Sequence, residues 1–310
     1  MSEKRINRKQ LWLWIAAAMI APLTASAAGQ SWVTVGITAA VCTALSCTLH
    51  FQIDINVEWS RWFCGLQWLW SAAALGHILD DVPLAWPQAE HPAWIVLILL
   101  LAALWSVRQG SEACSRVGAT LFWIVGILMA VVCAAAVKDV RPEYIKPKLR
   151  IPDTNIFFVL LVPCAAILLP RRGKGGPWIL MAGVGVAALA VSFLTAGVLS
   201  PELAEALSNP FHEVSRTLTL SGAAQRFESL VSAGLTVSWV LLLCLLLSVA
   251  AEMWERAFPG KWGAAACAAA AVGIRLCGLR INAVLMAAGS VVFWGLLPVL
   301  AQGIGQRKKL

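Results

Sequence analysis

The residues best able to bind a small molecule surround a proline in the first apolar segment of the chain, residues 11–29. Pro22 is followed by small or hydroxyl-bearing side chains, namely Thr24, Ala25 and Ser26. Proline lacks an N–H group and opens the hydrogen-bond ladder of a helix, so it frees backbone polar groups for other partners. Freed N–H groups attract a carboxylate and freed carbonyls attract an ammonium group, and a free amino acid carries both.

A second proline, Pro163, stands at the middle of the short apolar segment 155–170, downstream of Phe158. The two prolines lie in the first and the sixth of ten apolar segments, which are corresponding members of two halves of five. Interrupted helices at corresponding positions are typical of inverted-repeat transporters and mark their binding sites. We therefore expect a ligand site at midplane between these segments, while a plain kink is the alternative for each proline taken alone.

Polar side chains on two other segments give this site weaker support. Gln67 and Ser71 are four residues apart, as are Ser232 and Thr236, so each pair shares one face of a helix. Trp239 follows the second pair along the chain. We treat Gln67, Ser71, Thr236 and Trp239 as candidate ligand contacts. Hydrogen bonds between helices, or from a hydroxyl to a carbonyl of its own helix, are the alternative.

No pattern in the sequence predicts an enzyme, a cofactor or a metal site. The nine cysteines lie mostly inside apolar runs without Cys-x-x-Cys spacing, and the four histidines form no ligand motif. No Asp, Glu or Lys lies deep in an apolar segment, as a proton relay would require, and His77 and Arg275 stand near segment ends. No nucleophile with a partnered base is present, so we expect no catalysis.

The segments that carry these residues have the length of membrane spans. The chain of 310 residues is 60% hydrophobic and 13% charged, with a mean hydropathy of +0.77. Soluble domains are about half apolar and about a quarter charged, so a soluble core cannot hide this apolar surface. The sequence predicts one all-α polytopic domain over residues 1–310. Its ten spans are expected at 11–29, 32–50, 61–79, 92–107, 113–137, 155–170, 178–199, 229–254, 262–279 and 282–301.

The distribution of basic residues favours cytoplasmic termini. The ends of the chain, residues 1–10 and 302–310, and the turn 170–177 are basic, whereas the loop 80–91 contains no Lys or Arg. This bias explains the net charge of +8 without nucleic-acid binding. The loop 138–154 disagrees, because its basic residues would face outward. It indicates either a miscounted helix or an acidic partner surface.

The first segment has a competing interpretation as a secretory signal peptide. A basic start, an apolar stretch and Ala25-Ser26-Ala27 resemble such a peptide with its cleavage site. Cleavage would leave nine spans and an outer N-terminus that no charge bias explains. We therefore expect the segment to remain as the first span.

The longest outer connection, residues 200–228, predicts short amphipathic helices that cap the bundle or gate a ligand site. Its charged residues are candidates for structural or gating ion pairs. They are Glu213, Arg216, Arg226 and Glu228. Exposed pairs of this kind contribute little to stability by themselves, so an orienting role is the simpler interpretation.

Several short motifs occur in a familiar order. The chain opens with Ile6-Asn7-Arg8-Lys9-Gln10, and Ala28-Gly29-Gln30-Ser31-Trp32 follows the first segment. Pro210-Phe211-His212-Glu213-Val214-Ser215-Arg216 then precedes Arg226-Phe227-Glu228 and Trp239. These motifs resemble the spore germination GerAB family, the B subunits of GerA-type germinant receptors. The chain is short for that family, and Ala18-Met19-Ile20-Ala21 stands where the first helix of the family usually has a glycine.

The resemblance implies the amino acid/polyamine/organocation transporter fold, an inverted 5+5 repeat of the LeuT type with discontinuous helices one and six. It also implies that the protein senses a small nutrient, such as an amino acid, at the plasma membrane or spore inner membrane. The implied partners are an A subunit and a C-subunit lipoprotein. A secondary amino-acid transporter of the same fold is the alternative function, and a scaffold that only anchors partner subunits is a third.

Overall fold

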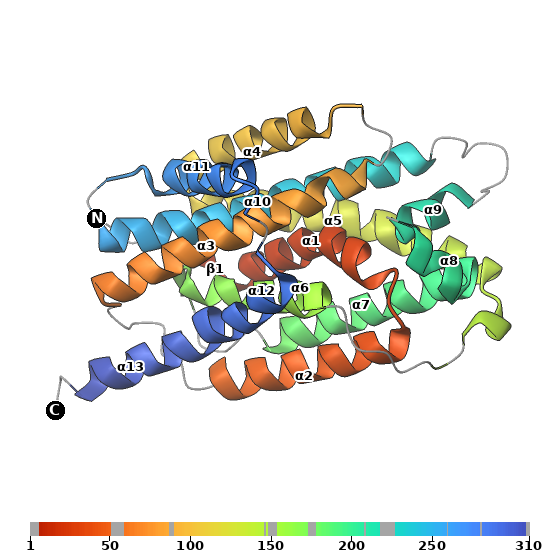
Figure 1. Cartoon of the computed structure of the whole chain (residues 1–310), viewed down its shortest axis with the longest axis horizontal. Coiled ribbons are helices and arrows are strands. Elements are labelled where there is room, and N and C mark those ends of the chain that lie inside the picture. The colour runs from red at the N-terminus through yellow and green to blue at the C-terminus, as the bar shows by residue number, and fades with distance from the viewer. Residues whose placement is uncertain are drawn as a thin grey trace.

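The computed structural model of the chain is a bundle of helices, most of which run along the long axis of the molecule (Figure 1). It describes residues 6–50, 59–86, 90–145, 147, 154–172, 178–207, 209–217, 227–258, 260–279 and 281–307. All statements about the structure concern these residues. The all-α prediction is confirmed, since the single sheet is one pair of two-residue strands.

Each of the ten expected segments coincides with a helix. The first nine are α1 (Arg8–Ala27), α2 (Trp32–His50), α3 (Arg61–Asp81), α4 (Pro92–Arg108), α5 (Ser111–Ala136), α6 (Thr154–Ala165), α7 (Trp178–Leu199), α10 (Phe227–Ala257) and α11 (Gly263–Leu276). The last consists of α12 (Ala283–Ser290), the π-helical turn η5 (Val291–Leu296) and α13 (Leu297–Arg307). Short 3₁₀ turns are η1 (Val82–Ala85), η2 (Val137–Asp139), η3 (Pro142–Tyr144) and η4 (Ala166–Leu168).

Capping side chains fix where several helices begin. The Oδ1 atom of Asn7 accepts a hydrogen bond from the backbone N–H of Lys9 at 3.0 Å at the start of α1. Asn282 does the same for Val284 at 2.9 Å at the start of α12. Such bonds satisfy N–H groups that have no partner inside the helix. Gly110, with φ of 97°, permits the tight reversal between α4 and α5.

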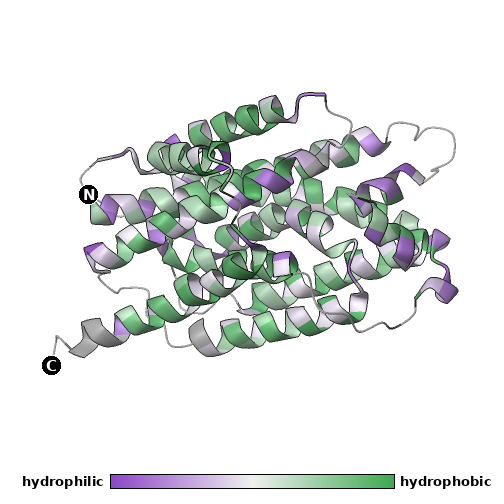
Figure 2. Ribbon diagram, viewed as in Figure 1, coloured by the Kyte–Doolittle hydropathy of each residue, from purple (hydrophilic) through white to green (hydrophobic). Residues whose placement is uncertain are grey.

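The composition of the helices is that of an integral membrane protein. Five described helices are long and apolar enough to cross a membrane, and four shorter ones are also apolar. Hydrophobic residues predominate along the helices (Figure 2), and many of them are exposed on the outside of the bundle. On α4, for example, Trp94, Ile98, Leu101 and Trp105 are all exposed. Water-soluble monomers rarely expose such continuous apolar surface, whereas lipid tails cover it without cost.

The helix α1 lies at the centre and packs against α5, α6, α7 and α10. Its Trp14 is fully buried and donates a hydrogen bond from Nε1 to the carbonyl of Leu241 at 3.1 Å. Gly118 of α5 makes this packing feasible, because a Cβ atom there would lie 2.5 Å from Cδ1 of Trp14. The first span is therefore part of the core.

The two ends of the bundle are distinct. The strands β1 (Ile6–Asn7) and β2 (Arg171–Arg172) pair in parallel and join the start of α1 to the segment after α6. The helix α13 ends toward the same end (Figure 1), which we call the termini end. The short helices α8 (Pro201–Ala206) and α9 (Pro210–Thr217) lie at the opposite end, which we call the α9 end.

The expected interruption of the first and sixth segments is wrong. The helix α1 continues from Arg8 to Ala27 with Pro22 inside it. The helix α6 likewise passes through Pro163 and ends at Ala165, where η4 follows. Proline is tolerated inside membrane helices when neighbouring groups satisfy the freed backbone atoms. A side chain from α10 does so in α1.

Candidate functional site

The hydroxyl of Ser238, on α10, lies in the hydrogen-bond ladder of α1 just before Pro22. It accepts a hydrogen bond from the N–H of Ala21 at 2.8 Å. Its single hydrogen is shared between the carbonyl oxygens of Ala17, at 2.7 Å, and Ala18, at 3.2 Å. Pro22 cannot donate to the Ala18 carbonyl, so Ser238 satisfies the group that the proline frees. The backbone groups expected to bind a ligand are thus already occupied by protein.

The hydroxyl groups after Pro22 are also satisfied within α1. Thr24 donates to the carbonyl of Ala21 at 2.8 Å, and Ser26 donates to the carbonyl of Pro22 at 2.8 Å. Both side chains are buried, and Ala25 is partly buried. The alternative interpretation, bonding to the helix's own carbonyls, therefore describes these two residues in this state of the protein.

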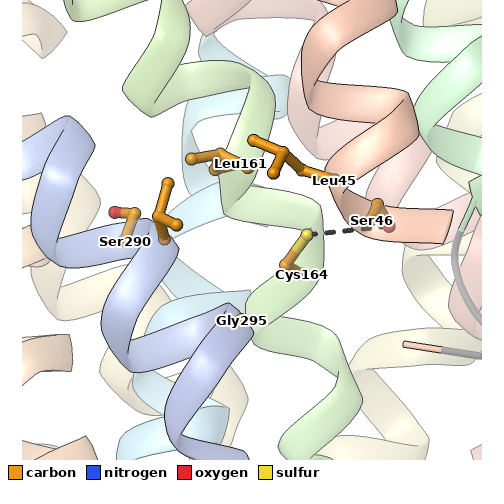
Figure 3. Close-up of a pocket in the computed structure, with 7 residues that line it drawn as sticks. Leu45, Ser46, Leu161, Cys164, Ser290 and Gly295 are labelled. Atoms are coloured by element: carbon orange, nitrogen blue, oxygen red, sulfur yellow. Dashed lines mark hydrogen bonds between the residues drawn. The ribbon is translucent and has the colours of Figure 1, made fainter. Parts of the chain in front are cut away.

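A small cavity lies beside Pro163 instead. It is lined by Leu45 and Ser46 from α2, Leu161 and Cys164 from α6, and Ser290, Val291 and Gly295 from α12 and η5 (Figure 3). Its volume is about 10 Å³, which holds at most a single water molecule. The Cys164 thiol donates to the Ser46 hydroxyl at 3.9 Å, and the Ser290 hydroxyl is buried without a hydrogen-bond partner in the described part of the chain. The cavity is therefore small but not wholly apolar.

Phe158 lies one and a half turns before Pro163 and is fully buried. The ring of His77 packs edge-on against it, with centroids 5.1 Å apart. The Nε2 atom of His77 is 3.1 Å from Oδ1 of Asn155 at the start of α6. Neither Phe158 nor Pro163 is among the residues that line the cavity, although Pro163 lies between the lining residues Leu161 and Cys164 in the sequence.

Gln67 joins α3 to the π-helical turn η5. Its Nε2 donates to the carbonyl of Phe293, and its Oε1 is buried without a partner among the described residues. Leu297 donates to the carbonyl of Val292, so the next bond of the π-helical turn would come from position 298. That residue is Pro298, which has no N–H. Gln67 therefore satisfies the carbonyl that this proline leaves open.

Aromatic stacking holds the same region together. Trp70 stacks on Phe293 with centroids 4.8 Å apart and an interplanar angle of 5°. Gly289 is required here, because a Cβ atom would lie 2.1 Å from Cη2 of Trp70. Ser71 donates back to the carbonyl of Gln67 at 2.8 Å. π-Helical turns inside α-helices occur frequently at functional sites.

The two candidate ligand contacts on α10, Thr236 and Trp239, contact other parts of the protein. Trp239 is 1% exposed and belongs to the apolar core. Thr236 donates to the carbonyl of its own helix at Ser232 at 2.6 Å. Ser238, between them in the sequence, makes the contact with α1, yet a single serine in a helix carries no periodic signal that would have revealed it.

The charged residues of the capping segment form a small network at the α9 end. Arg216 lies 3.2 Å from Glu213 and 3.6 Å from Glu228. The buried His212 lies 3.2 Å from the Ser232 hydroxyl and 3.5 Å from Glu228, both through Nε2. The predicted pairing of Glu213, Arg216 and Glu228 thus exists, and it fastens α9 to α10. Arg226 lies outside the described residues.

A wide cleft at the termini end was not expected from the sequence. It has a volume of about 1450 Å³, and we call it the vestibule. Its wall includes charged side chains of α4, α5, α10 and the turn before α11, namely Arg108, Glu112, Arg116, Glu252, Glu255 and Lys261. These residues come from two stretches, 108–116 and 252–261, that are far apart in the sequence, which is why no motif reveals the cleft. Among the described residues no group of three or more His, Cys, Asp or Glu side chains is arranged to hold a metal ion.

Comparison of the chain with models of known protein families gives no match, and comparison with curated protein sequences gives none either.

Proposed function

We propose that the chain is a receptor subunit of the germinant-receptor B type, with ten spans arranged as two related halves of five. The packing of the helices supports the repeat. In chain order, α6, α7, α10, α11 and α12 follow α1 to α5 as the second half. The contact of α1 with α5 has a counterpart in that of α6 with α12, and the contact of α3 with α11 in that of α10 with α4. Repeats related by a pseudo-twofold axis generate such matched contacts.

The observation that carries the ligand-binding proposal is the cavity beside Pro163. It lies where α6 meets α2 of the first half and η5 of the second half. Ser46 and Ser290 supply polar groups in an otherwise apolar wall. A cavity of about 10 Å³ cannot hold an amino acid, so nutrient binding requires a second packing in which α6 and η5 separate. The ligand would favour that packing and thereby signal.

The proposed orientation places the termini end in the cytoplasm. Arg61, Arg108, Arg116 and Lys261 belong to helix ends or turns at that end. Basic residues flanking spans predominate on the cytoplasmic side of membranes. At the α9 end, Lys138 and Arg141 would then be available to an acidic partner such as the C-subunit lipoprotein, and the A subunit would associate within the spore inner membrane.

The test is ligand-dependent thermal stabilisation of the purified chain in detergent or nanodiscs. Amino acids, sugars and nucleosides are screened at millimolar concentration, because a ligand of the folded form raises stability by mass action. We expect an amino acid to raise the melting temperature, and Ser46→Leu, which fills the cavity, to abolish the rise. Thr48→Leu, on the exposed face of the same helix, is the matched control and should keep it. Absence of any stabilising ligand, or an unchanged rise in Ser46→Leu, would contradict the proposal.

The vestibule favours the second candidate, a secondary amino-acid transporter, because a transport pathway needs a wide opening. Uptake of a labelled amino acid by the chain alone in liposomes decides between the two. The receptor proposal predicts binding without uptake. Uptake that stops when the ion gradient is dissipated would establish transport instead.

A further inference from the structure

Two cysteines from different helices meet at the termini side of the bundle. Cys114 lies in the first turns of α5, and Cys244 lies in α10. Both are buried, at 5% and 2% exposure, and their thiols are neighbours. Each thiol also donates to α4, Cys114 to the carbonyl of Ser106 at 3.3 Å and Cys244 to that of Ala103 at 3.8 Å. The pair is thus held on one face of α4, at carbonyls three residues apart on that helix.

The vestibule lies next to this pair. Its wall includes Ala113, which precedes Cys114 in the sequence, and Leu104, which follows Ala103, while neither cysteine is among the residues that line it. Arg108 and Arg116 also line it, and Cys114 stands near the N-terminus of α5. Nearby cations and a helix N-terminus both favour a thiolate over a thiol. A small polar oxidant in the vestibule would therefore come within one residue of Cys114, which lies closer in the sequence to the vestibule wall than Cys244 does.

We propose that Cys114 and Cys244 form a redox-active dithiol, which a peroxide entering through the vestibule converts to a disulfide between α5 and α10. In the first step the Cys114 thiol releases its proton and the resulting thiolate attacks one peroxide oxygen. The O–O bond breaks, a sulfenic acid forms, and the departing hydroxide (or alkoxide) takes up the released proton and leaves as water (or an alcohol). In the second step the Cys244 sulfur attacks the Cys114 sulfur, and the S–O bond breaks. The departing hydroxide takes the Cys244 proton and leaves as a second water. Two thiols are oxidised by two electrons, and one peroxide is reduced.

The disulfide would constrain the core of the bundle. α5 and α10 both pack against α1, and α10 carries Ser238, which holds α1 near Pro22. A covalent link between α5 and α10 would thus limit any separation of helices on that side of α1. The inference is independent of which small molecule, if any, the chain recognises.

The experiment uses the full chain in nanodiscs with all cysteines except Cys114 and Cys244 replaced by alanine. After brief exposure to hydrogen peroxide, the protein is denatured and treated with a maleimide, and its intact mass is measured. We expect that neither cysteine reacts with the maleimide and that the mass is lower than that of the reduced, unlabelled chain by two hydrogen atoms. Dithiothreitol should reverse both changes. Cys114→Ser and Cys244→Ser in the same background are the controls. Neither variant should form a disulfide within the chain. In Cys244→Ser no second thiol can react with the sulfenic acid of Cys114, so this acid should accumulate and be trapped by dimedone.

A second variant keeps only Cys42 and Cys164, which are buried on α2 and α6 away from the vestibule. It should react more slowly with peroxide than the Cys114 and Cys244 pair. Phenylarsine oxide, which bridges adjacent thiols, should protect the pair from peroxide. Retention of both thiols after peroxide, or addition of oxygen to each sulfur without loss of hydrogen, would overturn the proposal. Equal rates in the two pairs would overturn the role of the vestibule.

Discussion

The hydroxyl of Ser238 and the backbone N–H of Ala21 form a hydrogen bond of 2.8 Å between residues 217 positions apart in the chain. The bond lies inside the bundle, where α10 crosses α1, and both residues are buried. It replaces a bond that α1 would otherwise make within itself near Pro22. Ser238 thus converts a proline-weakened turn into a specific contact between two spans.

Replacement of Ser238 by alanine should destabilise the protein by about 1–2 kcal/mol, because it leaves the carbonyl freed by Pro22 without a partner and removes the hydrogen bonds that join α10 to α1. Unfolding in mixed micelles of increasing SDS content measures the change. Ser71→Ala is the matched control, since Ser71 is equally buried but only bonds back to its own helix. It should change stability by a few tenths of a kcal/mol. Equal losses in the two variants would show that the contact between α10 and α1 contributes nothing specific.

The sequence predicts the helices of this protein better than their contacts. Long apolar runs bounded by polar residues determine where a membrane helix begins and ends. For α7 the expected first and last residues, Trp178 and Leu199, are those of the structure. The effect of a proline inside a span depends instead on its neighbours. Pro22 could not be predicted to continue a helix, because the group that compensates it, Ser238, comes from a distant segment. The vestibule was missed for the same reason.

A double-mutant cycle tests whether Gln67 compensates for Pro298. Gln67→Leu removes the donor to the Phe293 carbonyl and should cost about 1–2 kcal/mol in the native background. Pro298→Ala supplies an N–H that can bond to a carbonyl of the preceding turn. In that background the Gln67→Leu change should therefore cost less, with a coupling energy of at least about 0.5 kcal/mol. If the two stability losses are strictly additive, Gln67 does not compensate for Pro298.

The ion pairs at the α9 end should contribute little to stability. The side chains of Arg216 and Glu213 are 43% and 32% exposed, so water and salt screen their attraction. Arg216→Gln should cost less than about 1 kcal/mol, and the cost should shrink in high salt. His212→Leu removes a buried ring bonded to Ser232 and should cost more. Both are measured by unfolding at low and high salt. If Arg216→Gln costs more stability than His212→Leu, the ion pairs contribute more than His212 does to holding α9 against α10.

Arg171, in β2, should oppose folding as long as its guanidinium is charged. The side chain is 4% exposed, and its Nε atom has no hydrogen-bond partner among the described residues. Burial, and secondarily the nearby Arg8, lowers the pKa of Arg171 from its ordinary value to about 10. A base with a lower pKa in the folded state than in the unfolded state binds its proton more weakly when folded. Its protonation therefore reduces stability at every pH below the folded-state pKa.

Arg171→Met should accordingly stabilise the protein by roughly 1–3 kcal/mol at neutral pH, because it removes a buried charge whose Nε atom has no partner among the described residues and keeps an apolar side chain. The gain should be constant below a pH of about 9 and shrink above a pH of about 10, where the folded wild type loses the proton. Arg61→Met, at an exposed helix start, is the control and should show no such pH dependence. Stability of both variants is followed by unfolding between pH 7 and a pH of about 10.5. If Arg171→Met is less stable than the wild type, the charge is compensated in the folded protein. The guanidinium would then help to hold β1, at the start of α1, against β2, which follows α6.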